Sequence, residues 1–389
     1  MEKVRFAIIG LGNQGGMYLT KLFGGGQIQN GYVSAVCDTN PRKIEAVKEY
    51  LQGVSVFTDY KELLSSGLAD AVIVAVPHYQ HPEISIAALK AGIHVLCEKP
   101  AGVYTKQVKE MNAVAEKSDA LFTMMYNQRT NPLYIKMHDI VQKGEIGEIR
   151  RVNWIITNWF RTQYYYDSGT WRATWRGEGG GVLLNQCPHQ LDLLQWICGM
   201  MPQKVRAFCH FGKWHDIETE DDVTAYLEFS NGATGAFVTT TADSPGTNRL
   251  EIVGSKGKMV CEKDELTIYR LKEDLQEFLM SAQNGFAEPE NAVEVIGQSC
   301  ENPQHAGIIN NFANAILGKE PLYVEGKEGI YCVELMDSML LSAWKDKAVT
   351  LPVDDEEYLQ QLEKRIAVSK EKQGKDILID NTMSYGGTK

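Results

Sequence analysis

Two short stretches of the chain carry side chains that could move a proton. The first is Glu98-Lys99-Pro100, which follows a short apolar run and therefore stands at the end of a predicted strand. The second is Pro188-His189, which follows three consecutive glycines, Gly179–Gly181. A lysine can bind a substrate oxygen and stabilise it as an alkoxide, and a neutral imidazole can accept a proton. Together the two stretches predict chemistry at a hydroxyl group.

The surroundings of His189 favour a neutral ring. Pro188 is typical of the first position of a helix, so His189 should lie in the first turn. The partial positive charge of that helix end disfavours imidazolium. Asp192 follows on the same face, where it could hold the imidazole ring or pair with Lys99. The alternative is a histidine buried only for packing, but the glycines before it allow a ligand to approach closely.

The N-terminus has the pattern of a nucleotide-binding turn. An apolar run, Val4–Ile9, leads into Gly10-Leu11-Gly12-Asn13-Gln14-Gly15 and then into helix-forming residues. We expect Gly10 to allow the turn, Gly12 to admit a pyrophosphate against bare backbone, and Gly15 to let helix and strand pack closely. The helix N-terminus, with Asn13 and Gln14, would offer N–H groups to the phosphates.

A carboxylate follows the next apolar run. Tyr32–Cys37 ends at Asp38, which could accept hydrogen bonds from an adenosine ribose diol and would repel a 2′-phosphate. This position predicts NAD rather than NADP. The alternative role, a cap for the helix that starts near Pro41, is compatible with it.

Further residues are expected at the same edge of the sheet. The apolar run Ala69–Val76 reads as a central parallel strand, and the loop after it would lie where ligands bind in open α/β sheets. The predicted cofactor-binding residues are therefore Gly10, Gly12, Asn13, Gln14, Gly15, Asp38, Pro77, His78, His81, Glu98 and Lys99.

The elements that must position these residues fall into two parts. Up to residue 126, short apolar runs alternate with helical segments, which predicts a doubly wound parallel sheet, a Rossmann domain over residues 1–126. Longer alternating strands with turns such as Ser230-Asn231-Gly232 predict a large open, mostly antiparallel sheet in an α/β domain over residues 127–353. A charged helical tail covers residues 354–389, with Gly374 expected to end its helix.

Composition sets the class of protein. The 389 residues suit two domains, and a formal net charge of −11 argues against nucleic acid or an anionic membrane surface as a partner. No apolar run approaches the roughly 20 residues of a membrane span. The eight cysteines have no metal-ligand spacing, and the N-terminus enters a strand without a signal pattern. We expect a reduced, cytoplasmic protein without a metal.

Taken together, these motifs are similar to those of the Gfo/Idh/MocA family of sugar and inositol oxidoreductases. The likeness covers roughly residues 4–350 and rests on the glycine turn, Asp38, the loop from Pro77 to His81, Glu98-Lys99-Pro100, Trp171-Arg172, and Gly179–Gly181 with His189 and Asp192. It implies NAD as cofactor and an open sheet used for subunit contact, hence a homo-oligomer (dimer, tetramer or hexamer). It also implies Lys99 as the substrate-binding and proton-relay lysine and His189 as the catalytic acid–base.

One position departs from the family pattern. Many members have an aspartate four residues before the histidine, where this chain has Asn185. An amide can bind a sugar hydroxyl, but it cannot accept a proton as a carboxylate does. We therefore expect Asn185 to contact the substrate, and His189 with Lys99 to carry the proton.

Between residues 154 and 176, aromatic rings are crowded and interleaved with amide and guanidinium groups. Rings stack on the apolar faces of sugars, and these polar groups bind hydroxyls, so the stretch favours a glycoside-sized ligand. About half of the rings should be core or subunit contacts. The predicted substrate-binding residues are Asn185, Asp192, Arg172, Trp171, Asn127 and Tyr165, with Arg129 as a further candidate.

The expected function is NAD-dependent oxidation of a secondary hydroxyl of a glucose-type sugar or glycoside. The choice of C3, giving a 3-oxo sugar, comes from the resemblance alone. Two alternatives stay open. One is a myo- or scyllo-inositol or aldose dehydrogenase, and the other is a redox-neutral NAD-dependent glycosidase of the same family. A sensor that only binds NAD would have no use for both Lys99 and His189.

Overall fold

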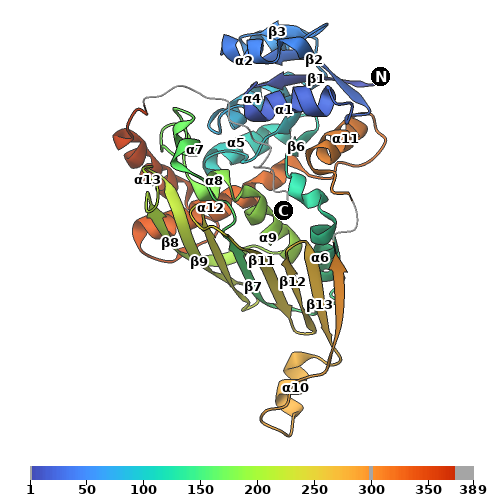
Figure 1. Cartoon of the computed structure of the whole chain (residues 1–389), viewed down its shortest axis with the longest axis vertical. Coiled ribbons are helices and arrows are strands. Elements are labelled where there is room, and N and C mark those ends of the chain that lie inside the picture. Colours follow the sequence, from blue (N-terminus) through green and yellow to red (C-terminus); the bar gives the residue numbers. More distant parts are fainter. Residues whose placement is uncertain (1, 298–300, 373–389) are drawn as a thin grey trace.

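The computed structural model describes residues 2–297 and 301–372, which form two sheets joined by helices (Figure 1). Gly374, the predicted end of the tail helix, and Cys300 lie outside the described residues. The predicted fold class, a Rossmann sheet followed by an open, mostly antiparallel sheet, is confirmed. The predicted domain boundaries at residues 126 and 353 stay predictions.

The first sheet has six strands in the order β3-β2-β1-β4-β5-β6, and every neighbouring pair is parallel. The order reverses between β1 and β4, so a crevice opens there at the carboxyl ends of the strands. The central strand β4 is apolar and buried throughout because helices cover both faces of the sheet. The strands are β1 Val4–Ile9, β2 Gly31–Cys37, β3 Ser55–Phe57, β4 Ala71–Val74, β5 His94–Cys97 and β6 Phe122–Met124.

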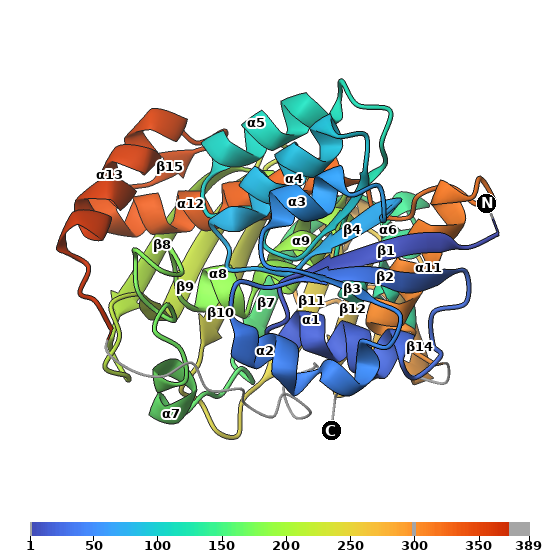
Figure 2. The same ribbon diagram turned by 90° about the horizontal axis from the view of Figure 1, so that it is seen from above.

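Helices cover this sheet on two sides. Figure 2 shows α3, α4 and α5 on one face and α1 and α2 on the other. The helix after the glycine turn is α-helical only over α1 and continues as the π-helical segment η1, Tyr18–Phe23. The second helix starts at Pro41, as expected, ends at Ala46, and is followed by the 3₁₀ turn η2, Lys48–Tyr50. The helices are α1 Asn13–Met17, α2 Pro41–Ala46, α3 Tyr60–Ser65, α4 Gln80–Lys90 and α5 Thr105–Ala115.

The second sheet has nine strands in the order β14-β13-β12-β11-β7-β10-β9-β8-β15, and only β7 and β10 pair in parallel. Strands β13, β14 and β15 are not among those predicted from the sequence; β14 is an exposed edge strand with no buried face, and β15 has two residues. The strands are β7 Ile149–Ile156, β8 Pro202–Phe211, β9 Glu220–Phe229, β10 Thr234–Thr240, β11 Asn248–Gly254, β12 Gly257–Glu262, β13 Glu265–Leu271, β14 Asn291–Gly297 and β15 Val349–Thr350.

Helices α9 and α12 lie between the two sheets in Figure 1, and α11 packs on the Rossmann sheet through the ring of Phe312, 6.1 Å from that of Phe6. Helix α10 projects from the end of the second sheet (Figure 1). The remaining elements are η3 Asn127–Thr130, α6 Pro132–Gln142, α7 Gln163–Asp167, α8 Val182–Asn185, α9 Pro188–Cys198, α10 Leu275–Ser281, α11 Gln304–Ile316, η4 Gly326–Glu328, α12 Gly329–Lys345 and α13 Asp355–Val368.

Among residues 2–297 and 301–372, no helix combines the length and the hydrophobicity that a membrane crossing requires. The seven described cysteines are free thiols, and all except Cys209 are buried. They therefore contribute to the core as small apolar side chains.

Candidate functional site

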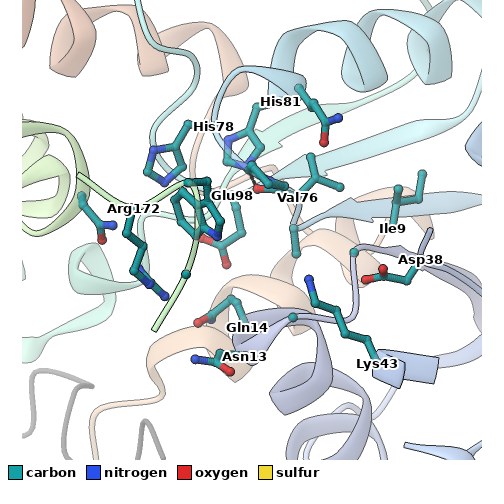
Figure 3. Close-up of a pocket in the computed structure, with 18 of the residues that line it drawn as sticks. Ile9, Asn13, Gln14, Asp38, Lys43, Val76, His78, His81, Glu98 and Arg172 are labelled. Atoms are coloured by element: carbon teal, nitrogen blue, oxygen red, sulfur yellow. Dashed lines mark hydrogen bonds between the residues drawn. The ribbon is translucent and has the colours of Figure 1, made fainter. Parts of the chain in front are cut away.

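A cavity of about 1450 Å³ runs from the crevice of the Rossmann sheet to the loops of the second sheet. Figure 3 shows Asp38 and Lys43 at one end of this pocket and Arg172 at the other. Of the predicted site residues, Gly15, Asp192 and the further candidate Arg129 do not line it. Those that do are Gly10, Gly12, Asn13, Gln14, Asp38, Pro77, His78, His81, Glu98, Lys99, Asn127, Tyr165, Trp171, Arg172, Asn185 and His189.

The glycine turn leaves room for a phosphate. Gly10 has a φ of +95°, and a Cβ on it would lie 2.5 Å from the carbonyl oxygen of Ala75. A Cβ on Gly12 would meet nothing within 4 Å, so the backbone there faces open space. Gly15 does not line the cavity, and a Cβ on it would lie 1.8 Å from the carbonyl oxygen of Gly10. Gly15 thus lets the helix pack closely on the turn and on Ile8 of the strand, and its place among the cofactor-binding residues stays a prediction.

The carboxylate of Asp38 is held rigidly at the end of β2. Its Oδ2 accepts a hydrogen bond from the Leu11 N–H at 2.7 Å, and its Oδ1 accepts one from the Asn40 N–H at 2.8 Å. The expectation that Asp38 could cap the next helix is wrong, because the N-cap of α2 is Asn40. A fixed anion beside the glycine turn fits a ribose diol and disfavours a 2′-phosphate.

Strand β5 delivers Glu98 and Lys99 to the floor of the cavity. The Nζ of Lys99 donates to the backbone oxygen of Asn185 at 2.7 Å. Glu98 is buried; its Oε1 accepts from the Tyr18 hydroxyl and its Oε2 from the Lys99 N–H at 3.1 Å. Burial lowers the pKa of Lys99, while the carboxylates of Glu98 and Glu178 act in the opposite direction. Burial also raises the pKa of Glu98.

His189 lies in the first turn of α9, with Pro188 at the helix start, as the sequence indicates. Its Nδ1 is buried and has no hydrogen-bond partner among the described residues. The pKa of His189 is lowered well below its usual value, first by burial and then by the charge of Lys99. Burial thus contributes most to keeping the ring neutral, whereas the sequence pointed to the helix end.

Asp192 does not hold the His189 ring and does not pair with Lys99. Its Oδ2 and Oδ1 accept hydrogen bonds from Nε and Nη2 of Arg129, at 2.8 and 2.6 Å. Arg129 also donates to Glu328, and both Arg129 and Asp192 are 1% exposed. This ion pair is buried and neither residue lines the cavity, while the predicted contacts of the two residues with substrate stay predictions.

The aromatic stretch contributes both to the cavity and to the core. The guanidinium carbon of Arg172 lies 4.5 Å from the ring centre of Tyr165 and 4.7 Å from that of Trp171, and Arg172 Nη1 donates to the Tyr165 hydroxyl at 2.9 Å. Trp159 and Arg161 also line the cavity. The rings of Trp154, Tyr166 and Trp175 are instead buried in the core.

Two histidines of the loop after β4 lie close together. The ring centres of His78 and His81 are 5.7 Å apart, and the His78 ring meets Trp171 edge-on, also at 5.7 Å. The Nδ1 and Nε2 atoms of His81 contact the carbonyl oxygens of Pro100 and Val76 at 2.7 and 2.8 Å. His81 therefore ties the ends of β4 and β5 together, in addition to lining the cavity.

His305 is the main cavity residue that sequence analysis missed. It lies at the start of α11, its ring centre is 5.8 Å from that of Tyr18, and its Nδ1 lies 3.5 Å from Asn127 Nδ2. Burial lowers the pKa of His305 to about 3. No local motif marks this residue, and only the return of α11 to the first sheet brings it to the site.

Comparison with known families and proteins agrees with this geometry. Residues 4–126 match the model of an oxidoreductase family with an NAD-binding Rossmann fold, and residues 134–260 match the GFO/IDH/MocA C-terminal domain. Myo-inositol 2-dehydrogenase of Thermotoga maritima is 27% identical over 266 residues, which are 67% of this chain and 75% of that enzyme. Trans-1,2-dihydrobenzene-1,2-diol dehydrogenase of Mus musculus is 28% identical over 57% of this chain and 65% of that enzyme.

A solved structure shows the same arrangement with cofactor bound. The WlbA dehydrogenase from Chromobactrium violaceum, in complex with NADH and UDP-GlcNAcA, is 28% identical. The alignment covers 91% of this chain and 97% of that chain, with a TM-score of 0.77. The glycine turn, the space over Gly12 and the fixed Asp38 fit the same cofactor. The chain is a member of the Gfo/Idh/MocA family, an NAD-dependent oxidoreductase of the sugar and inositol type.

Proposed function

We propose that this enzyme oxidises a secondary hydroxyl, at C3, of a glucose-type sugar or glycoside to the 3-oxo sugar. The observation that carries the proposal is the single cavity in which Lys99 and His189 meet the ring-rich loop of Tyr165, Trp171 and Arg172. Flat rings and a guanidinium fit a pyranose with several hydroxyls. Family resemblance supports the C3 position.

In this proposal the residues have separate roles. NAD, when bound, supplies the acceptor for the hydride that leaves the substrate carbon. His189, neutral because it is buried, takes the hydroxyl proton. Lys99 binds the oxygen as it becomes an alkoxide, and its contact with the backbone of Asn185 holds its Nζ in place. Asn185, Asn127, Tyr165, Trp171 and Arg172 contact the remaining hydroxyls and the ring faces.

An inositol dehydrogenase is an equally supported alternative. The Thermotoga relative carries an inositol name, and a cyclitol presents the same secondary hydroxyls to Lys99 and His189. A redox-neutral glycosidase would use the same two residues, but it would release an aglycone and no NADH. The reaction products therefore distinguish the three functions.

The test is a panel of glucosides, free sugars and inositols, assayed with NAD by NADH absorbance and product mass. We expect a loss of two mass units in a glycoside, which is the change on oxidation of one hydroxyl. Oxidation of inositols alone would replace the proposal by the first alternative. Released aglycone without NADH would replace it by the second.

We expect Asp38→Ser to raise the ratio of kcat/KM for NADP to that for NAD by roughly tenfold to a hundredfold, because it removes the anion that repels a 2′-phosphate. Arg42 and Lys43, which line the same end of the cavity, could then bind the phosphate. Glu45→Ser removes the same charge from the exposed surface of α2 and serves as control. An equal change in both variants would show that only the net charge matters.

The pH dependence of kcat/KM should reflect the lowered pKa values of His189 and Lys99. A base must be unprotonated to act, and the pKa of His189 is lowered, so activity should persist through about pH 6, where an ordinary histidine is largely protonated. The lowered pKa of Lys99 should bring the loss of activity on the alkaline side to a lower pH than for an exposed lysine. An acid-side loss of activity centred at about pH 6.5 would contradict the lowered pKa of His189.

We also propose that the open face of the second sheet is a contact between subunits. Ile155, Phe208 and Tyr226 are 41%, 54% and 46% exposed. The strand register places Ile155 and Phe208 in one row across the sheet and Tyr226 two residues along, so all three share one face. Exposed apolar residues grouped in this way are typical of protein contacts.

A further inference from the structure

Glu178 is a buried carboxylate next to the cavity residue Asn185, and it has no role in the proposal above. It lies between the loop of Trp171 and Arg172 and the three glycines, and it is 2% exposed. One oxygen, Oε2, accepts a hydrogen bond from the backbone N–H of Ala173, and the other, Oε1, accepts one from the side-chain Nδ2 of Asn185. Glu178 thus connects the substrate loop to the helix that carries Asn185.

The chemistry of these contacts fixes the orientation of the Asn185 amide. An ionised carboxylate only accepts hydrogen bonds, so the NH₂ end of the amide must face Glu178. The oxygen Oδ1 is then the end that Asn185 presents to the cavity it lines. An oxygen in that place can only accept, so it selects a substrate group that donates.

The other contact of Glu178 orders the neighbouring loop. Ala173 has a φ of 51°, in the left-handed region that residues other than glycine rarely adopt. The hydrogen bond from its N–H to Glu178 is one of the contacts that hold it there. The backbone N–H of Glu178 in turn donates to the carbonyl of Thr174 at 3.0 Å. Arg172, next to Ala173, is thereby held over the cavity.

We propose that Glu178 is a positioning residue that sets the hydrogen-bond polarity of Asn185, so that this position of the site accepts a hydrogen bond from a substrate hydroxyl. The inference rests on the proposed oxidation at Lys99 and His189 and deepens it. Burial raises the pKa of Glu178, whereas Arg172, the hydrogen bonds from Ala173 and Asn185, and Lys99 act in the opposite direction. A carboxylate that accepts at both oxygens follows from the N–H donor that faces each of them.

Three variants test the contact: Glu178→Gln, Asn185→Asp and the double variant. Glutamine has one acceptor oxygen for two donors, so Glu178→Gln leaves one N–H without a partner. Asn185→Asp places two carboxylates in contact, and they repel. We expect each single change to lower kcat/KM by about tenfold or more. In the double variant the glutamine accepts from Ala173 and donates to Asp at 185, so activity should exceed that of Asn185→Asp by about tenfold.

A second readout does not depend on turnover. In Asn185→Asp the repulsion between the two carboxylates raises their pKa in the folded state. The free energy of unfolding of this variant should therefore be closest to that of the wild type at low pH and should fall as pH rises. The Tm difference from the wild type should therefore be larger at about pH 8 than at about pH 5.5, and the double variant should remove this dependence. Glu218 is a matched control, because it accepts from the Trp175 N–H in the same loop but does not contact Asn185. Glu218→Gln combined with Asn185→Asp should give no recovery.

The outcomes distinguish the two proposals. Additive losses in the double variant, with no pH dependence of Tm in Asn185→Asp, would overturn the role of Glu178. Recovery by Glu218→Gln would also overturn it, because any loss of charge would then suffice. If the wild type oxidises no sugar or cyclitol but the pH dependence of Tm and its removal are found, the proposed function fails and the Glu178–Asn185 contact stands.

Discussion

Replacing His189 by asparagine is expected to lower kcat/KM by about 10²–10⁴-fold, the usual contribution of a positioned general base. Asparagine keeps a polar side chain of similar size at the start of α9, so the change removes the basic nitrogen and little else. The proposed cofactor contacts at Gly12 and Asp38 lie on other elements, so NADH binding, followed by fluorescence, should be nearly unchanged. Pre-steady-state absorbance would then show that the chemical step itself is slowed.

His138→Asn provides the matched control. His138 belongs to α6, its ring stacks on Trp196 at 4.1 Å between ring centres, and it does not line the cavity. We expect this variant to retain kcat/KM within a factor of about two, since it removes an imidazole far from the proposed chemistry. An His189→Asn enzyme as active as the His138→Asn enzyme would remove His189 from the mechanism.

The cofactor half of the site could be predicted because its signals are local. The glycine turn and Asp38 belong to one strand–turn–helix–strand unit, and the end of a parallel strand places Glu98 and Lys99 at the same edge. Periodicity and turn residues were therefore sufficient for the Rossmann sheet. They also gave the first six strands of the second sheet, which alternate between a buried and an exposed face.

The remaining features depend on contacts between distant elements. Periodicity reports that a residue faces the core, but not which neighbour it meets there. Asp192 lies on the face predicted for it, yet its partner Arg129 comes from η3, 63 residues earlier. His305 reaches the cavity because α11 returns to the first sheet, and Glu178 meets the side chain of Asn185 across the three glycines. No spacing rule in the sequence encodes these three contacts.

The pair of Arg129 and Asp192 gives the second large effect. Arg129→Met should lower the free energy of unfolding by about 3–5 kcal/mol, because it leaves the buried carboxylate of Asp192 without its cation. Burial already raises the pKa of Asp192. In the variant that pKa rises further, so the loss of stability should be smaller at low pH and grow as pH rises. Urea denaturation at several pH values measures both effects.

Two comparisons separate the buried charge from other causes. Arg129→Met combined with Asp192→Leu removes both charges, so it should be more stable than Arg129→Met alone although it carries one more substitution. Lys204→Met breaks the exposed pair of Lys204 with Glu228, which should cost at most about 1 kcal/mol. A double variant less stable than Arg129→Met would show that packing of the arginine stem, rather than its charge, is what the fold requires.

The same pair connects stability to the site. Asp192 lies one turn beyond His189 on α9, and Arg129 lies on η3 beside Asn127. The bidentate contact thus fixes the helix of the proposed base against the segment that joins the two sheets. If that connection matters for chemistry, Arg129→Met should lower kcat more than NADH affinity under conditions where it is still folded. An equal loss of kcat and of NADH affinity would mean that the ion pair stabilises the fold but has no separate effect on the chemical step.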